Sequence, residues 1–211
     1  MDNADQIRTA AAQLFATLGY EGTSLQAIAE RVGVTKQTLL YHYPSKDALR
    51  RAVLEQVFAH WRERLPQMLE AVTSGRGRFE ALTRELVHFF EADDNRARLL
   101  VRELLDNPAE MRRLLADNLR PWILLVAQYI REGQQSGLIH ADVDAEAYVL
   151  QVIMLVLANA AVHSIADSVL ASDSRDAATR QMQELLRLTR TALFKSSREA
   201  RAKSIHRSEE T

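Results

Sequence analysis

The 211-residue sequence contains no cysteine, and glycine and proline are scarce, with 7 and 4 residues. The absence of cysteine excludes disulfide bonds, thiolate metal sites and a cysteine nucleophile, and it suits a reducing compartment. Few glycines and prolines favour helices with short connections. No alternation of apolar and polar residues typical of strands persists, and no internal repeat is evident. These features predict an all-α protein.

Neither sign of charge dominates, because 27 Lys and Arg residues stand against 28 Asp and Glu residues. A general basic coat for nucleic acid is therefore excluded, and any DNA contact must come from a local patch. The first residues, MDNADQIRTA, are acidic and polar and do not form a signal peptide. We therefore expect a cytoplasmic protein.

Recognisable catalytic motifs are also missing. The six histidines form no His-Glu-x-x-His pattern, and the chain has no nucleophile elbow and no suitably spaced pair of carboxylates. His140, Asp142, Asp144 and Glu146 alternate in one short segment and could suggest a metal cluster. Capping of the following helix by Asp144 explains them better, since no further ligand set has a recognisable spacing. We expect no catalytic residue, no metal and no cofactor.

One long segment, residues 147–166, carries no formal charge and has the length of a membrane span. Gln151, Asn159 and His163 interrupt it, and its flanks are acidic rather than rich in Lys and Arg. We interpret it as a helix that is buried or lies at a dimer interface, with a membrane span as the alternative.

The stretch TSLQAIAERVGVTKQTLLYHYPSK, residues 23–46, has the pattern of two short helices joined by a tight turn. Thr23 and Gln26 have the spacing of a capping box. Gly33 stands where a helix ends in a left-handed residue, and Thr35 can cap the next helix. One apolar stripe marks the first of the two helices, formed by Leu25, Ile28, Ala29 and Val32.

The second of these helices has a donor-rich polar face, which suits base edges and phosphates. A lysine opens the helix that follows, where backbone N–H groups and a cation can both meet a phosphate. An ordinary helix corner with a solvated face is the alternative. The candidate DNA-binding residues are Thr23, Ser24, Thr35, Lys36, Gln37, Thr38, Tyr41, His42 and Lys46.

This stretch also resembles the N-terminal domain of the tetracycline-repressor (TetR) family of bacterial transcription regulators over residues 5–50. At Gln37 the family commonly has glycine, and at Leu40 it commonly has tyrosine. The first difference adds a candidate base reader, and the second removes a hydroxyl that often touches a phosphate. The matching segments are Thr23-Ser24, Ile28-Ala29, Gly33-Val34-Thr35, Thr38-Leu39, Tyr41-His42-Tyr43 and Ser45-Lys46-Asp47.

Apolar stripes predict a longer helix from Ser45 to about residue 73, which Pro66 should kink or break. A loop over 73–78 precedes helices over 79–92, 95–106, 109–119 and from 121 to about 133. Two long helices follow, the last over 176–196. We expect about nine helices in total, as a helix-turn-helix domain (1–48), a sensing and dimerisation domain (49–196) and a polar tail (197–211).

A single helix-turn-helix covers only a few base pairs, so specific binding calls for two copies about one helical turn (~34 Å) apart. The last two helices are long, apolar and distant in sequence from the DNA face. Paired with a second copy they would form a four-helix bundle, which gives a homodimer. The family resemblance implies the same arrangement.

The resemblance further implies that residues 50–170 enclose a pocket for a small-molecule effector that releases a palindromic DNA operator. The expected function is thus a ligand-released repressor, with a DNA-binding or scaffold protein without a ligand as the alternative. Taken alone, each candidate for the pocket wall more often belongs to the core, because pockets and cores share this composition. The candidates are Trp61, His88, Phe89, Arg102, Trp122, Tyr129, Met154 and His163.

Overall fold

The computed structural model describes residues 2–71, 75–170 and 174–196, and within these ranges the chain forms ten helices and no β-strand. The all-α prediction is confirmed, with one helix more than the nine expected. The helices are α1 (Asn3–Gly22), α2 (Leu25–Val32), α3 (Lys36–His42), α4 (Lys46–Ala71), α5 (Gly75–Glu91), α6 (Asp94–Asp106), α7 (Pro108–Asn118), α8 (Arg120–Gln135), α9 (Ala145–Val169) and α10 (Ser174–Leu193).

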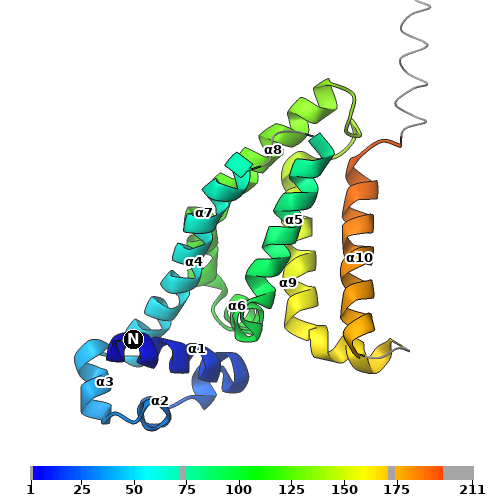
Figure 1. Cartoon of the computed structure of the whole chain (residues 1–211). Helices are drawn as coiled ribbons and strands as arrows, with labels where there is room; N and C mark the ends of the chain where they lie inside the picture. Colours follow the sequence, from blue (N-terminus) through cyan, green and yellow to red (C-terminus); the bar gives the residue numbers. More distant parts are fainter. Residues whose placement is uncertain (1, 72–74, 171–173, 197–211) are drawn as a thin grey trace, which may run out of the picture.

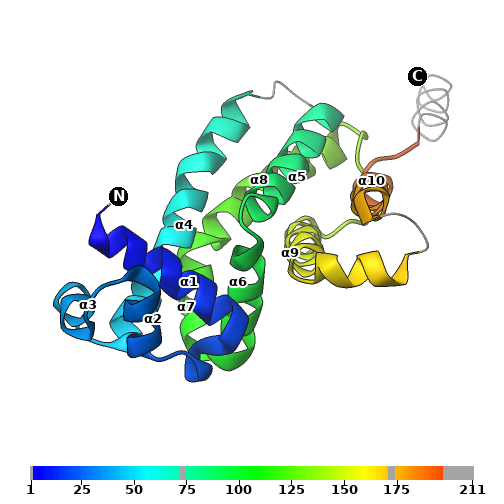
Figure 2. The same ribbon diagram turned by 60° about the horizontal axis from the view of Figure 1, so that its bottom comes forward.

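The first three helices form a small unit at one end of the molecule, and α4 leads from it into a larger bundle (Figure 1). Helices α5, α9 and α10 lie side by side in that bundle, and the view in Figure 2 shows α1 next to α6. One hydrophobic core is continuous from Ile7 and Phe15 of α1 to Leu99 of α6 and Val156 of α9. The small unit is therefore packed onto the bundle and not tethered by a linker. The predicted domain boundary at residue 48 falls inside α4 and stays a prediction.

Helix α1 is interrupted at Gly19, whose φ of 81° and ψ of 167° are not helical. A positive φ costs glycine little because it has no Cβ atom. Helix α1 buries Ile7, Leu14 and Phe15 in the core. Leu18, in the last part of α1, is 56% exposed.

The loop predicted over 73–78 is wrong for residues 75–78, because α5 begins at Gly75. Two glycines lowered the expectation of a helix there, yet the cost of about 1 kcal/mol for each is small enough for tertiary packing to override. Residues 72–74 lie outside the described residues. Helix α4 continues through position 66 as one element, so Pro66 does not divide it into two helices.

Helix α9 begins as predicted, with its amide groups capped by Asp144, whose Oδ1 accepts from the Glu146 and Ala147 N–H groups at 3.1 and 3.0 Å. Residues 145–162 are long and apolar enough to cross a membrane, but a single such helix is weak evidence for a span. The helix packs against α5, α6, α8 and α10. Its other face exposes Leu150 and Leu155, which are 38% and 40% exposed.

Candidate nucleic-acid interface

The start of α2 differs from the predicted capping box. Ser24 is the cap, since its Oγ accepts from the Ala27 N–H at 3.0 Å. Thr23 is buried, and its hydroxyl donates to the Gly19 carbonyl at 2.7 Å. Gln26 donates to Glu30 at 2.8 Å and does not reach back to residue 23. The break at Gly19 places its carbonyl within reach of Thr23, so this candidate holds the turn together and faces away from solvent.

The turn between α2 and α3 forms as predicted. Gly33 adopts the left-handed conformation, with φ 79° and ψ 28°, and its N–H donates to the Ala29 carbonyl at 3.0 Å. Thr35 caps α3, because its Oγ1 accepts from the Thr38 N–H at 3.0 Å. Ala29 and Leu39 are fully buried. Because Ala29 is small and buried and α2 contacts α3, we expect Ala29 to let α3 pack closely on α2 and so to fix the direction of its outer face.

That outer face carries most of the remaining candidates. Lys36 and Gln37 are exposed, and Tyr41 is 85% exposed, whereas Thr38 and His42 are half-buried. Behind them Tyr43 is buried and its hydroxyl donates to the Ala4 carbonyl at 3.2 Å. Helix α3 is thus anchored on one side and presents hydrogen-bond donors on the other. A groove of double-stranded DNA admits a helix with such a face.

The start of α4 lies beside α1. Ser45 caps the helix by accepting from the Ala48 N–H at 3.0 Å. The Lys46 ammonium lies 4.1 Å from the centre of the Tyr20 ring, in a cation–π contact. The Tyr20 hydroxyl donates to Asp47 at 2.7 Å, and burial, together with this hydrogen bond, raises the pKa of Tyr20 to about 12. Tyr20 therefore remains a protonated donor at neutral pH and holds the start of α4 against α1.

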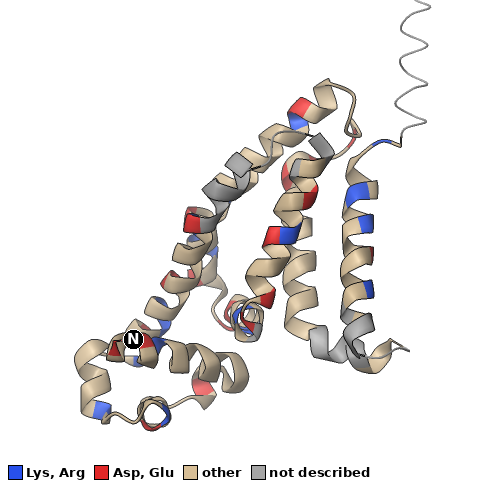
Figure 3. Cartoon of the chain, in the orientation of Figure 1, with Lys and Arg blue, Asp and Glu red and all other residues tan. Residues whose placement is uncertain are grey.

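Charged residues of both signs are interspersed along the helices (Figure 3). Helix α3 carries a single Lys or Arg, Lys36, and α2 carries one, Arg31. A nucleic-acid contact at this end would therefore depend on a few cations and on the polar donors of α3, in agreement with the near-zero net charge of the chain.

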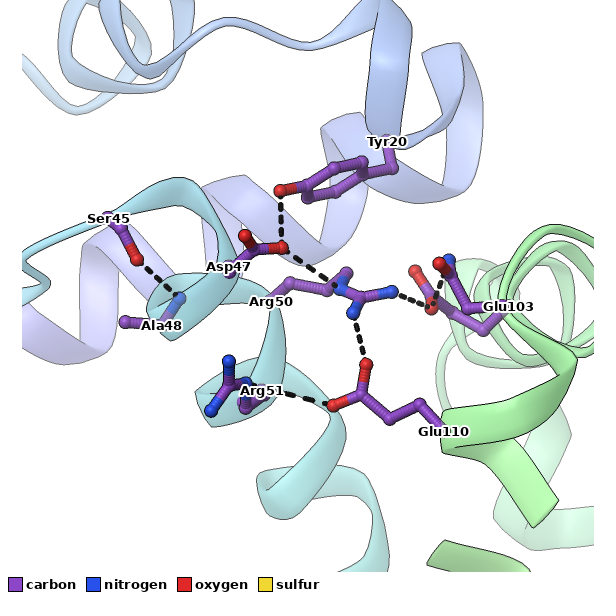
Figure 4. A network of polar contacts seen from close by, with 9 residues as sticks. Tyr20, Ser45, Asp47, Ala48, Arg50, Arg51, Glu103 and Glu110 are labelled. Atoms are coloured by element: carbon purple, nitrogen blue, oxygen red, sulfur yellow. Dashed lines mark hydrogen bonds and ion pairs between the residues drawn. The ribbon is translucent and has the colours of Figure 1, made fainter. Parts of the chain in front are cut away.

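A buried network of charges joins α4 to the bundle (Figure 4). The side chain of Arg50 is 7% exposed, and its Nη1 donates to Glu103 of α6 at 3.0 Å. Its Nη2 donates to Glu110 of α7, and its Nε lies 3.9 Å from Asp47. Burial raises the pKa of Glu103, an effect that the guanidinium of Arg50 opposes. Through Asp47 the network continues to Tyr20 of α1.

The sequence predictions missed this network, although a signal for it exists. Arg50 stands one and two turns before Leu54 and Phe58, which are buried in the core. Glu103 stands one turn after Leu99, which is also buried. A charged residue in register with an apolar stripe indicates a buried charge, and such charges in proteins are paired.

Two of the predicted pocket residues, Arg102 and His88, do not line the apolar cavities described below. Arg102 is exposed and donates to the Thr17 carbonyl at 3.1 Å, so it joins α6 to α1. His88 is exposed on α5. The side chain of His163 lies outside the described residues.

The other five line cavities inside the bundle. Trp61, Phe89 and Met154 lie around a cavity of about 50 Å³ between α4, α5, α6, α7 and α9. Trp61 also lines a second cavity of about 60 Å³, together with Trp122. Tyr129 lines a third cavity, of about 250 Å³, near the ends of α5, α8 and α10, and this cavity shares Phe79, Leu82 and Val126 with the second. These five residues are thus spread over three adjoining cavities of the bundle.

Comparisons with known proteins match both halves of the chain to one family. Residues 7–53 match the family described as bacterial regulatory proteins, tetR family. Residues 76–188 match the family described as tetracyclin repressor-like, C-terminal domain.

Among curated relatives, the HTH-type transcriptional regulator RutR of Escherichia coli is 49% identical over 55 residues, which is 26% of each chain. The HTH-type transcriptional activator FasR of Mycolicibacterium smegmatis is 33% identical over 95 residues, which is 45% of this chain and 43% of FasR. These matches cover less than half of either relative. A transcriptional regulator from Saccharomonospora viridis, solved in complex with choline, superposes with a TM-score of 0.71 at 20% identity, over 92% of this chain and 98% of its own.

Proposed function

Because this chain belongs to the TetR family of bacterial regulatory proteins, we propose that it is a cytoplasmic, DNA-binding transcriptional repressor controlled by a small molecule. In this proposal a homodimer binds a palindromic DNA operator, and binding of the effector in the bundle releases the DNA. The observation that carries the proposal is the outer face of α3, whose exposed donors stand on a helix capped by Thr35 and anchored through Leu39.

The roles on this face follow from side-chain chemistry. Lys36 and Gln37 are exposed in the first turn of α3 and are our candidates for base readers. Lysine donates to guanine O6 and N7, and glutamine pairs with adenine N6 and N7. Ser24, Thr35, Thr38, Tyr41, His42 and Lys46 would position the helix through phosphate contacts, which fix register without reading sequence.

The dimer would form through α9 and α10. The exposed leucines of these helices, Leu150, Leu155 and Leu188, are 38%, 40% and 48% exposed in the single chain. Apolar side chains on two neighbouring helices suit a bundle with the same two helices of a second copy. A two-fold arrangement of this kind repeats the two-fold symmetry of a palindromic operator.

Helix α4 offers the connection between the effector and the DNA. Lys46 at its start lies beside the DNA-facing unit, and Trp61 lies in the wall of two cavities. An effector releases DNA only if it binds more tightly to the conformation that does not fit the operator. Displacement of α4 in that conformation would change the separation of the two α3 helices in the dimer.

The proposal is tested by selecting binding sites from random DNA with the purified full-length chain. We expect a palindrome whose half-sites lie about one helical turn (~34 Å) apart. Gln37→Ala should lower the discrimination at one base-pair position of each half-site by about 1–3 kcal/mol. Equal loss of affinity for every operator variant would instead assign Gln37 to positioning. No enrichment of any sequence would contradict the proposed function.

The selected operator then serves in a screen of metabolites for release of the DNA. An effector that lowers operator affinity supports ligand control. The effect of the effector on transcription from the selected operator separates a repressor from an activator, since only a repressor raises transcription when it leaves the DNA.

A further inference from the structure

A polar cleft lies where the DNA-facing unit meets the bundle. Helix α1 packs against both α4 and α6, and residues of all three helices line the cleft. Its volume is about 570 Å³, whereas each of the three cavities described above is smaller. Ligand sites in proteins commonly have volumes of roughly 300–1,000 Å³. The cleft is therefore large enough to hold a small molecule without any movement of the helices.

Arg96 of α6 presents a free edge of its guanidinium at this cleft. Its Nη1 donates to the Phe89 carbonyl, and its Cζ lies 4.2 Å from the centre of the Phe89 ring. Within the described part of the chain, its Nε and Nη2 form no hydrogen bond or ion pair. Neither atom is buried and unsatisfied, as Nε of Arg50 is, so both are accessible on a residue that lines the cleft.

The same guanidinium is partly desolvated without a carboxylate partner. Burial lowers the pKa of Arg96, an effect that the charge of Asp93 opposes. No described carboxylate lies within ion-pair distance of Arg96, in contrast to Arg50, which pairs with Glu103 and Glu110. The contacts with Phe89 hold the group in one orientation. Its Nε–H and Nη2–H lie side by side on one edge, a geometry that binds both oxygens of a carboxylate.

The other charges of the cleft are negative. Asp93 and Glu63 line it together with Arg96, so carboxylates outnumber guanidinium groups. Asp93 caps α6 through Oδ1, which accepts from the Asn95 N–H at 3.0 Å. Glu63 is exposed and forms no hydrogen bond or ion pair with any other described residue. A ligand with a negative charge alone would be repelled by these two carboxylates, so it must also carry a positive charge.

We propose that this cleft binds a small zwitterion of the α-amino acid class. The ligand carboxylate pairs with the free edge of Arg96, and its ammonium group is attracted by Glu63 and Asp93. The apolar part of the lining, which includes Ala12 of α1 and Val53 of α4, contacts the side chain of the ligand.

A ligand in this position joins the DNA-facing unit to the bundle. Gln13 lines the cleft from α1, and its Oε1 accepts from Nη2 of Arg31 of α2 at 3.1 Å. Binding therefore stabilises the arrangement of α1, α4 and α6 and raises the unfolding temperature as the ligand concentration rises. The site does not depend on the proposed operator or on an effector in the apolar cavities.

The test titrates the full-length chain with three probes that share one pentane chain. L-2-aminopentanoate carries both charges, pentanoate lacks the ammonium group, and 2-aminopentane lacks the carboxylate. We expect isothermal titration calorimetry to show that L-2-aminopentanoate binds about tenfold tighter than either of the others, the effect of one hydrogen-bonded charge. It should also raise the unfolding temperature more than they do.

Two variants separate the two charges of the ligand. Arg96→Met should remove the preference for L-2-aminopentanoate over 2-aminopentane, and Glu63→Gln should reduce the preference over pentanoate. Arg84→Met and Glu85→Gln on α5 are the matched controls, because both residues are exposed and neither lines the cleft or the three cavities. Circular dichroism establishes that the variants fold, and the comparison of probes on the unaltered chain needs no variant.

The proposal is overturned if L-2-aminopentanoate shows no saturable binding, or binds no tighter than pentanoate and 2-aminopentane. A preference that persists in folded Arg96→Met, or in Glu63→Gln at full strength, overturns it as well. Equal loss in the two control variants would place the binding elsewhere and has the same consequence. None of these outcomes bears on the proposed function, which the operator selection tests separately.

Discussion

At the scale of single residues, Arg50 is a buried cation, because only 7% of its side chain is exposed. Its guanidinium is buried between two carboxylates, Glu103 and Glu110, and these belong to two different helices. Removing one member of a buried charge cluster leaves the others without compensation. The cluster therefore ties the start of α4 to α6 and α7 and makes any movement of α4 dependent on how these three side chains rearrange.

Arg50→Met should lower the free energy of unfolding by about 3–5 kcal/mol at pH 7, because it leaves Glu103 buried and unpaired. Urea unfolding of the two proteins measures the difference. Arg51→Met is the matched control, since the side chain of Arg51 is 69% exposed and lies 3.7 Å from Glu110. An exposed pair of this kind contributes about 0–1 kcal/mol. Similar losses in the two variants would contradict a special role of Arg50.

The raised pKa of Glu103 predicts how this loss depends on pH. The folded protein binds the proton of Glu103 more tightly than the unfolded chain does, because the pKa of Glu103 is raised above its ordinary value of 4.5. The resulting contribution to the free energy of unfolding is fully present below pH 4.5 and is lost as the pH rises through the pKa of the folded state. Arg50 opposes the rise, so Arg50→Met should raise the pKa of Glu103 further. The deficit of Arg50→Met should therefore shrink as the pH falls from 7 to 5. Urea unfolding at the two values checks this, and an equal deficit at both would contradict it.

At the scale of helices, the sequence best predicts features that depend only on residues close together in the chain, such as helix caps and turns. The caps Thr35, Ser45 and Asp144 and the left-handed Gly33 are local features, and each is found as predicted. The choice of Ser24 over Thr23 as a cap could not be predicted, because it depends on the break at Gly19. The outer face of α3 could be predicted from its polar run. The distribution of the predicted pocket residues over three adjoining cavities, and the exposure of Arg102, depend on how distant helices pack.

The crossing of α2 and α3 can be tested at Ala29, which is fully buried. Ala29→Leu should overpack this contact, lower stability by about 1–3 kcal/mol and displace the outer face of α3, which weakens operator binding. Thermal unfolding and a titration with the selected operator measure the two effects. Ala27→Leu, at a half-exposed position of the same helix, should change both much less. Operator affinity unchanged in a folded Ala29→Leu protein would contradict this role of Ala29.

At the scale of the whole molecule, the hydrophobic core that joins α1 to α6 and the near-neutral net charge both bear on DNA binding. The core joins α1 to α6 and so makes the DNA-facing unit part of the bundle. The net charge of −1 supplies little general attraction for DNA, so affinity must come from specific contacts in two half-sites. Operator binding by the proposed dimer should therefore depend strongly on its assembly.

Leu188→Glu on α10 should convert the dimer into a monomer and lower operator affinity at least tenfold, or by about 1.4 kcal/mol. A charge at this position would be buried without a partner when two copies meet. Sedimentation equilibrium gives the oligomeric state. Leu105→Glu is the matched control, because Leu105 is 75% exposed on α6, outside the α9–α10 face. A Leu188→Glu protein that remains dimeric would place the interface elsewhere.

Helix α4 also acts as a lever of fixed length. Lys46 and Trp61 are fifteen residues apart, which at 1.5 Å per residue is about 22 Å along the axis. If Trp61 were the pivot, a tilt of about 9° would carry the other end through roughly 3.4 Å, the spacing of successive base pairs along DNA. A tilt of this size could therefore put α3 out of register by one base-pair step, and it would require the contacts of Arg50 with Glu103 and Glu110 to rearrange.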